Sequence, residues 1–213
     1  MLAVGVCGSP RAGGNTEALL NVVLEGLRRH GFETRSLLLR DLRFSPCTGC
    51  RGCVGKGSCI ISDDFTRVAT PALLSADVVV VASPVYFNNV SALTKAFIDR
   101  TWCLRGRLRF KVGGAVVVGR GYGAELAITA IHAFMLKHEM ILAHRGVHGE
   151  GYEAGEVLRN GRALRDARRL AEVLARVAEA TAALRGALSC GALNSPANPM
   201  LKGAQDGGLD YED

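Results

Sequence analysis

The chain has 213 residues, of which 48% are hydrophobic and 22% charged, and a formal net charge of +6. These values predict a folded domain with a sizeable core and exclude a chain that is disordered over most of its length. No apolar run reaches the roughly 18 residues of a membrane span, and the first residues lack the basic segment of a signal peptide. The arginines are dispersed or lie in the last helical segment, so we expect no nucleic-acid binding.

Short apolar segments alternate with segments of helical periodicity along the chain. We predict strands at 2–7, 32–39, 77–82, 112–118 and 140–145, and helices ending at Gly31 and spanning about 64–75, 91–104, 124–138 and 161–188. This alternation predicts an α/β fold with a doubly wound sheet and right-handed crossovers. For five parallel strands we expect the flavodoxin-like order 2-1-3-4-5, whose ligand site lies at the carboxyl ends of the strands.

The domain organisation follows from the same pattern. We predict one flavodoxin-like domain over residues 1–188, with a cysteine-rich insertion at 44–62 after the second strand. Residues 189–213 are rich in Gly, Pro, Asn and Asp and are predicted to form a C-terminal tail or arm.

The insertion concentrates chemistry in thirteen residues, with four cysteines at Cys47, Cys50, Cys53 and Cys59. Successive two-residue spacings let one short loop wrap its thiolates around a single centre, and such soft ligands suit an iron–sulfur cluster or zinc. Structural zinc usually takes two cysteine pairs separated by a longer spacer, so the spacing favours a cluster, while a metal-free redox role stays open. Clustered cysteines without signs of secretion indicate a reducing, cytoplasmic compartment.

The first strand leads into a glycine-rich loop at residues 8–16, directly before a helix. Small residues and the helix N-terminus can enclose an anion, with Ser9, Asn15 and Thr16 as short donors and Arg11 as a positive fork. This pattern predicts a monophosphate cradle. The alternative is a plain turn in which Asn15 or Thr16 caps the helix.

A second loop follows the most apolar strand. Pro84 stiffens it, Tyr86 and Phe87 offer a flat surface, and Asn88 and Asn89 offer amide groups, so it can hold a planar heteroaromatic ring. The alternative is that the two aromatic side chains cap the core.

A third loop, residues 119–123, follows the next strand at the same sheet edge, and its glycines permit close approach of the backbone to a ligand.

Other polar and sulfur residues have simpler interpretations. We expect Cys7 and Cys103 to be buried core thiols, and we assign no role to Cys190 in the tail. Asp63 and Asp64 can pair with arginines or cap the next helix, and capping is the favoured interpretation.

Three motifs in order carry a family resemblance over about residues 2–185. Gly8-Ser9-Pro10-Arg11…Asn15-Thr16, Ser83-Pro84-Val85-Tyr86-Phe87 and Lys95-Ala96-Phe97-Ile98-Asp99-Arg100 resemble the NADPH-dependent FMN reductase group of flavodoxin-like proteins. The four cysteines followed by Asp63-Asp64 are similar to the iron–sulfur flavoprotein branch of that group.

The resemblance implies FMN and a 4Fe–4S cluster. It implies that the FMN phosphate is held by Ser9, Arg11, Asn15 and Thr16, and the isoalloxazine by Pro84, Val85, Tyr86, Phe87, Asn88, Asn89, Gly119, Gly121 and Tyr122. It implies that the cluster is ligated by Cys47, Cys50, Cys53 and Cys59. It also implies a homodimer or homotetramer with the flavin near a subunit interface.

The predicted function is electron transfer by a flavin-dependent oxidoreductase. The donor would be reduced ferredoxin or NAD(P)H, and the acceptor a small molecule or a protein; NADPH rests on the resemblance alone. We expect no general acid or base, because the cofactors carry the chemistry. The alternatives are a cluster-free NAD(P)H-dependent FMN or quinone reductase and a non-catalytic redox sensor.

Overall fold

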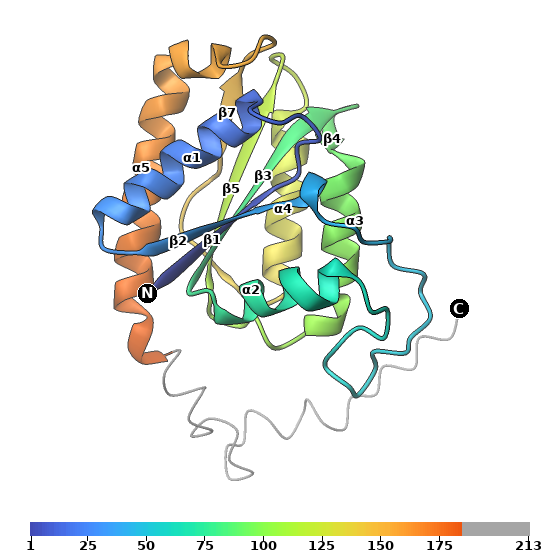
Figure 1. Cartoon of the computed structure of the whole chain (residues 1–213). Coiled ribbons are helices and arrows are strands. Elements are labelled where there is room, and N and C mark those ends of the chain that lie inside the picture. The colour runs from blue at the N-terminus through green and yellow to red at the C-terminus, as the bar shows by residue number, and fades with distance from the viewer. Residues whose placement is uncertain (185–213) are drawn as a thin grey trace. The chain divides into compact units, whose positions relative to one another are not determined.

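The computed structural model describes residues 1–184, of which Met1–Glu179 form one compact unit. Its strands follow the order β2-β1-β3-β5-β6, with β4 added to β3 and β7 to β5 (Figure 1). The strands are β1 (Leu2–Cys7), β2 (Glu33–Leu38), β3 (Val78–Tyr86), β4 (Asn89–Val90), β5 (Val112–Gly119), β6 (Ile141–Leu142) and β7 (Val147–Glu150). All pairings are parallel except that of β3 with β4.

Helices cover both faces of the sheet (Figure 1). They are α1 (Asn15–Arg29), α2 (Thr70–Ser75), α3 (Ala92–Arg100), α4 (Ala124–Lys137) and α5 (Gly161–Ala180). Short turns are η1 (Leu39–Asp41), η2 (Phe65–Ala69), η3 (Thr101–Leu104) and η4 (Glu156–Arg159). Helices α1 and α5 share one buried cluster with the sheet, and α2, α3 and α4 share the other.

The central strands are apolar throughout because side chains on both of their faces are buried. Val78 and Val80 of β3 belong to the cluster beneath α1 and α5, whereas Val79 and Val81 belong to the opposite cluster. Alternate side chains of a strand point to opposite faces, so a strand covered on both sides needs a continuous apolar run. The predicted fold class and the order of the first four long strands are confirmed.

The predicted fifth strand at 140–145 is wrong in its extent. Two short strands, β6 and β7, pair separately with β5. Between them Gly146 adopts a φ of +95° and its N–H donates to His144 Nδ1 at 3.1 Å. A side chain at Gly146 would meet Ile128 Cγ2 at 2.8 Å, so the turn that separates β6 from β7, directly after the predicted strand, requires glycine.

Other boundaries differ less. Strand β3 continues to Tyr86, through residues predicted to be loop, because it pairs with β5 as far as Pro84. Helix α5 begins at the predicted residue, but the predicted helix end at Leu188, the tail 189–213 and Cys190 lie outside the described residues. Among the described residues no helix has the length and apolar character needed to cross a membrane.

Candidate functional site

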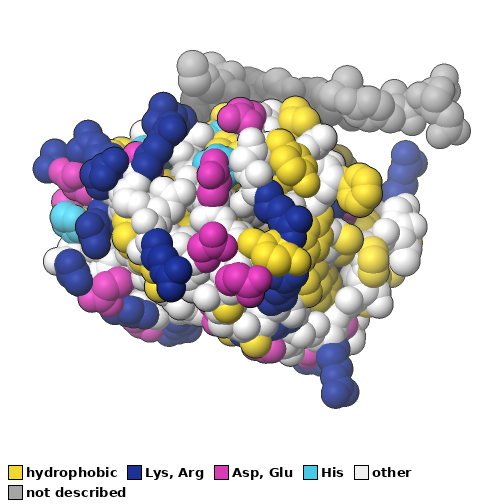
Figure 2. Space-filling model, turned by 90° about the horizontal axis from the view of Figure 1, so that it is seen from above, with side chains coloured by type: hydrophobic (Ala, Val, Ile, Leu, Met, Phe, Trp, Pro, Cys, Tyr) yellow, Lys and Arg dark blue, Asp and Glu magenta, His cyan; other side chains and the backbone are white. Residues whose placement is uncertain are grey.

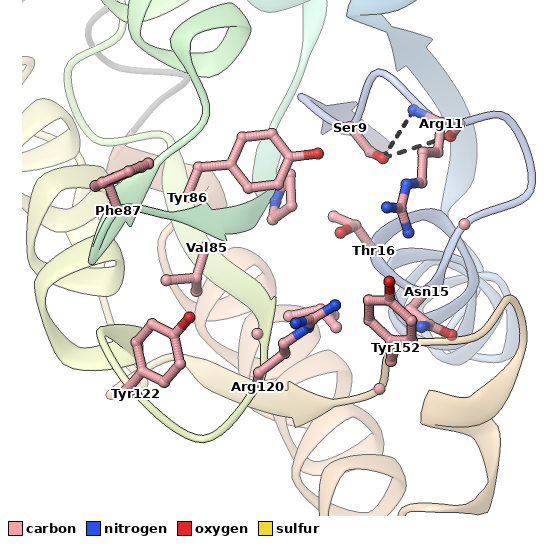
Figure 3. Close-up of a pocket in the computed structure, with 15 residues that line it drawn as sticks. Ser9, Arg11, Asn15, Thr16, Val85, Tyr86, Phe87, Arg120, Tyr122 and Tyr152 are labelled. Carbon is pink, nitrogen blue, oxygen red and sulfur yellow. Dashed lines mark hydrogen bonds between the residues drawn. The ribbon is translucent and has the colours of Figure 1, made fainter.

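The loops that follow β1, β3, β5 and β7 meet at the carboxyl edge of the sheet and line a cavity of about 420 Å³ (Figure 3). Ten of its lining residues were predicted: Ser9, Arg11, Asn15, Thr16, Pro84, Val85, Tyr86, Phe87, Gly119 and Tyr122. Residues that sequence reasoning missed complete the lining: Gly14, Val118, Arg120, Gly151 and Tyr152. A site at this edge is the position expected for a doubly wound sheet.

The turn before α1 forms one wall of the cavity. The Ser9 hydroxyl accepts a hydrogen bond from the Arg11 N–H at 3.2 Å, and the Arg11 side chain extends toward the cavity (Figure 3). The N-cap of α1 is Gly14, with no side-chain cap, so the alternative in which Asn15 or Thr16 caps the helix is wrong. A helix N-terminus without a side-chain cap presents backbone N–H groups that favour an anion.

Asn15 ties this turn to the segment after β7. Its Nδ2 donates to the Glu153 carbonyl at 2.8 Å, and its Oδ1 accepts from the Val157 N–H at 3.2 Å. A side chain at Gly151 would come within 2.8 Å of Asn15 Nδ2, so the close approach requires glycine there. The amide of Asn15 therefore holds two walls of the cavity together.

Buried hydroxyl groups hold the first and second loops together. Ser91 Oγ donates to the Gly8 carbonyl at 2.7 Å and lies 2.9 Å from Thr94 Oγ1, which donates to Ser83 Oγ at 3.0 Å. These three hydroxyl-bearing residues are at most 1% exposed. A Cβ at Gly8 would lie 1.8 Å from Thr94 Oγ1, so the packing admits only glycine. This network was not predicted, because single serines and threonines carry no distinctive spacing.

Aromatic side chains form the rim of the cavity. Phe87 is fully exposed, and Tyr86 and Tyr122 are 44% and 62% exposed, so the alternative that Tyr86 and Phe87 cap the core is wrong. Phe87 and Asn88 link β3 to β4 with φ values of 46° and 63°. Positive φ at both residues is typical of tight two-residue hairpins, and it is unusual for phenylalanine. The turn thereby presents the Phe87 ring to solvent beside the cavity.

Three predicted residues do not line the cavity: Asn88, Asn89 and Gly121. Asn89 Oδ1 instead accepts from the Val90 N–H at 2.8 Å. The missed residues Arg120 and Tyr152 lie together on the opposite wall, with the guanidinium carbon 3.7 Å from the ring centroid (Figure 3). Tyr152 was missed because the last strand was predicted at residues 140–145. The strand that reaches the carboxyl edge of the sheet is β7, which ends at Glu150, two residues before Tyr152.

Charge and apolar surface are unevenly distributed over this end of the molecule. Seen from above the carboxyl edge, hydrophobic side chains gather on one side and charged side chains mostly on the other (Figure 2). The lining of the cavity is divided in the same sense, with polar residues before α1 and apolar residues at the end of β3, as ligands with a charged and an aromatic part require.

The cysteine loop lies at a second place in the fold, against the end of α3. Its four cysteines, Cys47, Cys50, Cys53 and Cys59, line one cavity of about 70 Å³. The first two side chains are exposed, the other two half-buried, and all are free thiols. The Gly52 N–H and the Thr48 hydroxyl lower the pKa of Cys50. In the described part of the chain, no three His, Cys, Asp or Glu side chains are arranged as a metal site.

Two further cysteines are buried, as predicted. Cys7 is fully buried in the sheet, and Cys103 is 5% exposed. Cys103 also lines the cavity of the cysteine loop and donates to the Arg100 carbonyl at 3.2 Å. The pKa of Cys103 is raised to about 11, mainly by burial and to a smaller extent by the negative charge of Cys59. Its place beside the loop was not predicted, because it lies far along the sequence.

The two aspartates after the loop mainly make ion pairs. Asp63 pairs with Arg100 at 2.7 Å, and Asp64 pairs with Arg67 at 3.1 Å. Asp64 is the N-cap residue of η2 but makes no side-chain cap, while Asp63 accepts one hydrogen bond from the Phe65 N–H. The favoured interpretation, in which these residues cap the next helix, is therefore wrong for Asp64. For Asp63 it explains only the hydrogen bond from the Phe65 N–H.

Comparison with known proteins agrees with this geometry. The model of the family described as "NADPH-dependent FMN reductase" matches residues 1–151. An iron–sulfur flavoprotein of Methanocaldococcus jannaschii is 39% identical over 188 residues, which cover 83% of this chain and 97% of that protein.

Two solved structures share the fold. RosB, solved with a bound 8-demethyl-8-formylriboflavin-5'-phosphate, has a TM-score of 0.73 at 12% identity and covers all of this chain and 88% of its own. A flavodoxin from the domain Archaea has a TM-score of 0.59 at 16% identity, covering 84% of this chain and 99% of its own. At these identities the likeness establishes the fold alone.

The fold and the family match define a flavin-dependent oxidoreductase. Within that class, the chain belongs to the NADPH-dependent FMN reductase family, in its iron–sulfur flavoprotein branch.

Proposed function

We propose that the chain binds FMN in the cavity at the carboxyl edge of the sheet and a 4Fe–4S cluster at the cysteine loop, and that it transfers electrons between a reduced donor and an acceptor. One observation carries this proposal. In a chain of this family, a helix N-terminus without a side-chain cap and a turn with exposed aromatic residues line the same cavity.

The polar wall fits the phosphate of FMN. Ser9, Arg11 and Thr16 line it beside the first turn of α1, so hydroxyl groups, a guanidinium and backbone N–H groups point to one place. Asn15 lines it too, and we assign it chiefly to holding this wall to the loop after β7, because both ends of its amide bond there.

The apolar wall fits the isoalloxazine ring. Pro84, Val85, Tyr86, Phe87, Gly119 and Tyr122 line it, and a cavity of about 420 Å³ lies in the usual range for ligand sites. Asn88, Asn89 and Gly121 are assigned to shaping the turns that carry these residues. Arg120 and Tyr152 extend the proposed site on its far side.

The cysteine loop fits an iron–sulfur cluster by the chemistry of its donors. Four free thiols line a single cavity, and the buried guanidinium of Arg100, whose Nε–H has no partner, lines it as well. Positive charge and a free donor complement a group bound by thiolates. Because the thiols are not arranged around a common centre, we propose that Cys47, Cys50, Cys53 and Cys59 converge when the cluster binds.

The two groups would supply complementary chemistry when bound, because a flavin handles one or two electrons and the cluster handles one. The protein's own part is to hold both and to exclude water from the flavin face. The proposed donor is ferredoxin or NAD(P)H, and the proposed acceptor is a small molecule or a protein. Free cysteines along the described chain agree with the reducing, cytoplasmic compartment proposed for it.

We also propose a homodimer or homotetramer. Phe87 and Tyr122 expose large apolar surface at the cavity, at 104% and 62% of their possible area, and Leu126 in the first turn of α4 is 57% exposed. Exposed aromatic side chains of this kind favour burial against another subunit. Light scattering after size exclusion, on the wild type and on Phe87→Glu, measures the state and tests this surface.

The second candidate function is a cluster-free NAD(P)H-dependent FMN or quinone reductase. The observation that favours it is that the described thiols do not form a metal site.

One experiment separates the two functions. Protein purified without oxygen is analysed for iron, acid-labile sulfide and flavin, and then mixed with NADPH or NADH and a quinone. About four irons, four sulfides and one FMN per chain support the cluster-bearing carrier. Flavin without iron after anaerobic reconstitution, together with rapid oxidation of NAD(P)H, supports the reductase.

A further inference from the structure

Arg100, at the end of α3, joins the two ends of the cysteine loop. One terminal nitrogen donates to the Ser45 carbonyl at 2.7 Å and to Asp63 at 2.7 Å. The other donates to Asp63 at 2.9 Å and to the Ile61 carbonyl at 3.5 Å. Ser45 precedes the first cysteine, and Ile61 and Asp63 follow the last one. The Ser45 N–H also donates to Asp63 at 3.1 Å, and the Arg43 N–H donates to Asp64 at 2.8 Å. The guanidinium is therefore the buried centre of the contacts that close the segment containing all four thiols.

The guanidinium of Arg100 is completely buried. The Arg100 side chain is 0% exposed, and its carbon lies 4.7 Å from the centroid of the Phe65 ring. A buried arginine is stable only when its charge and its donors are matched. The pairing with Asp63 is bidentate and satisfies the outer edge of the fork.

One donor of Arg100 is left over. Its Nε atom is buried and has no hydrogen-bond partner, although Arg100 lines the cavity formed by the four cysteines. An unpaired buried N–H is costly, so it marks a place where a partner is expected. Five cysteines, the four of the loop and Cys103, line that cavity, so sulfur atoms are the most numerous side-chain acceptors there.

We propose that Arg100 is a positioning residue for the cluster: its fork holds both ends of the cysteine loop, and its Nε–H donates to a sulfur of the cluster or of a ligating cysteine. This inference rests on the proposed function. Hydrogen bonds and positive charge near the sulfurs set the potential of such clusters, so the donation raises the reduction potential. Lysine keeps the charge but not the arrangement, because its single nitrogen cannot pair bidentately with Asp63, reach both carbonyls and donate to a sulfur at the same time.

The first test uses the iron-free full chain and trypsin, which can cleave after the exposed loop residues Arg51 and Lys56. Arg100→Lys and Asp63→Asn are each expected to be cleaved there at least about fivefold faster than the wild type, since both weaken the closure. Arg67→Lys is the matched control, because Arg67 pairs with Asp64 at the surface, and its rate should stay at the wild-type value. Equal rates in all four proteins would overturn the closure.

The second test compares the reduction potentials of the reconstituted clusters in a spectroscopic titration. Arg100→Lys is expected to shift the equilibrium at least tenfold toward the oxidised cluster, which is about 59 mV for a one-electron couple. Asp63→Asn, which keeps the guanidinium and removes a nearby negative charge, should shift it the opposite way. A purely structural role predicts no shift, or shifts of the same sign in both variants, and either result would overturn the donation.

The outcomes separate this inference from the proposed function. If the wild type takes up no iron, the cluster is refuted and the donation falls with it, while the trypsin rates still decide the closure. If the wild type takes up iron and Arg100→Lys has the wild-type potential, the donation is refuted and the cluster stands. If Arg100→Lys does not fold, the Arg51→Lys protein, which lacks the other arginine that lines the cavity, is labelled with ¹⁵N in its arginine side chains. A coupling of ¹⁵N to the reduced cluster in electron–nuclear double resonance supports the donation, and its absence refutes it.

Discussion

The cavity at the sheet edge and the cysteine loop are both made of connecting segments, but different contacts hold them. The cavity walls continue from buried parallel strands and are joined by hydroxyl and amide groups that are almost fully buried. Residues 45–63 contain neither helix nor strand, and their ends are joined by the buried ion pair of Asp63 with Arg100 and by a hydrogen bond from the Ser45 N–H to Asp63. Arg107 adds one contact, to the Gly57 carbonyl at 2.7 Å.

This difference indicates that the cavity at the sheet edge is preorganised by the fold, whereas the cysteine loop is not. A cavity held by strands and buried hydrogen bonds keeps its shape without a ligand, so its affinity reflects preorganisation. A loop held at its two ends can change shape between them, so its thiols depend on the bound group for their final arrangement. Four predictions follow from this contrast, beginning with the largest effect.

Cys59→Ser should abolish iron binding at the cysteine loop and leave FMN binding at the sheet edge unchanged. We expect iron to fall from about four atoms per chain to nearly none, because one ligand of the cluster is lost, while FMN stays near one per chain. Iron, sulfide and flavin assays measure this. Cys103→Ser is the control, because Cys103 lines the same cavity but is not a proposed ligand. Equal iron loss in both variants would contradict the assigned ligand set.

Arg11→Gln should weaken the prepared site without affecting the loop. Losing a hydrogen bond to a charged phosphate costs about 1.5–3 kcal/mol, so the Kd for FMN should rise about 10- to 100-fold. Fluorescence titration of the flavin-free protein measures it. Arg28→Gln, on the exposed part of α1, should leave the Kd unchanged. A wild-type Kd in Arg11→Gln would remove Arg11 from the proposed phosphate site.

Thr94→Ala should show how firmly the cavity is held. It removes the two buried hydrogen bonds of the Thr94 hydroxyl, to Ser83 and Ser91, each worth about 0.5–1.5 kcal/mol, so the free energy of unfolding should fall by about 1–3 kcal/mol. Urea unfolding measures this, with Thr129→Ala on the exposed face of α4 as control. A change no larger than that of the control would show that the network does not stabilise the fold.

The last prediction concerns pH and the buried His138, which contacts the residue after Arg100. His138 lies 2.9 Å from the hydroxyl of Thr101, the residue after Arg100, and burial lowers the pKa of His138 to about 4. Between pH 6.5 and 4 the unfolded histidine binds a proton that the folded one does not, so stability present above pH 6.5 is lost as pH falls toward 4. His138→Gln should flatten this decline in urea unfolding, and an unchanged slope would assign it to other groups.

Local patterns in the sequence determined much of both regions. Alternating apolar and periodic segments predicted the fold and the order of the long strands, because a strand buried on both faces needs a continuous apolar run. Topology then places the loops after β1, β3 and β5 at one edge, so most of the cavity lining could be named. The spacing of four cysteines within one loop likewise predicted a shared thiol cavity.

Tertiary structure alone decided the contacts between distant segments. The pairing of Asp63 with Arg100, 37 residues apart, depends on where the cysteine loop packs, and two ordinary charged residues give no sign of it in the sequence. The last strand lies at Val147–Glu150, after a turn at Gly146, and Tyr152 therefore lies at the cavity. The turn requires glycine because a side chain at Gly146 would collide with Ile128. Sequence patterns describe what a segment can do locally, whereas packing determines which segments meet.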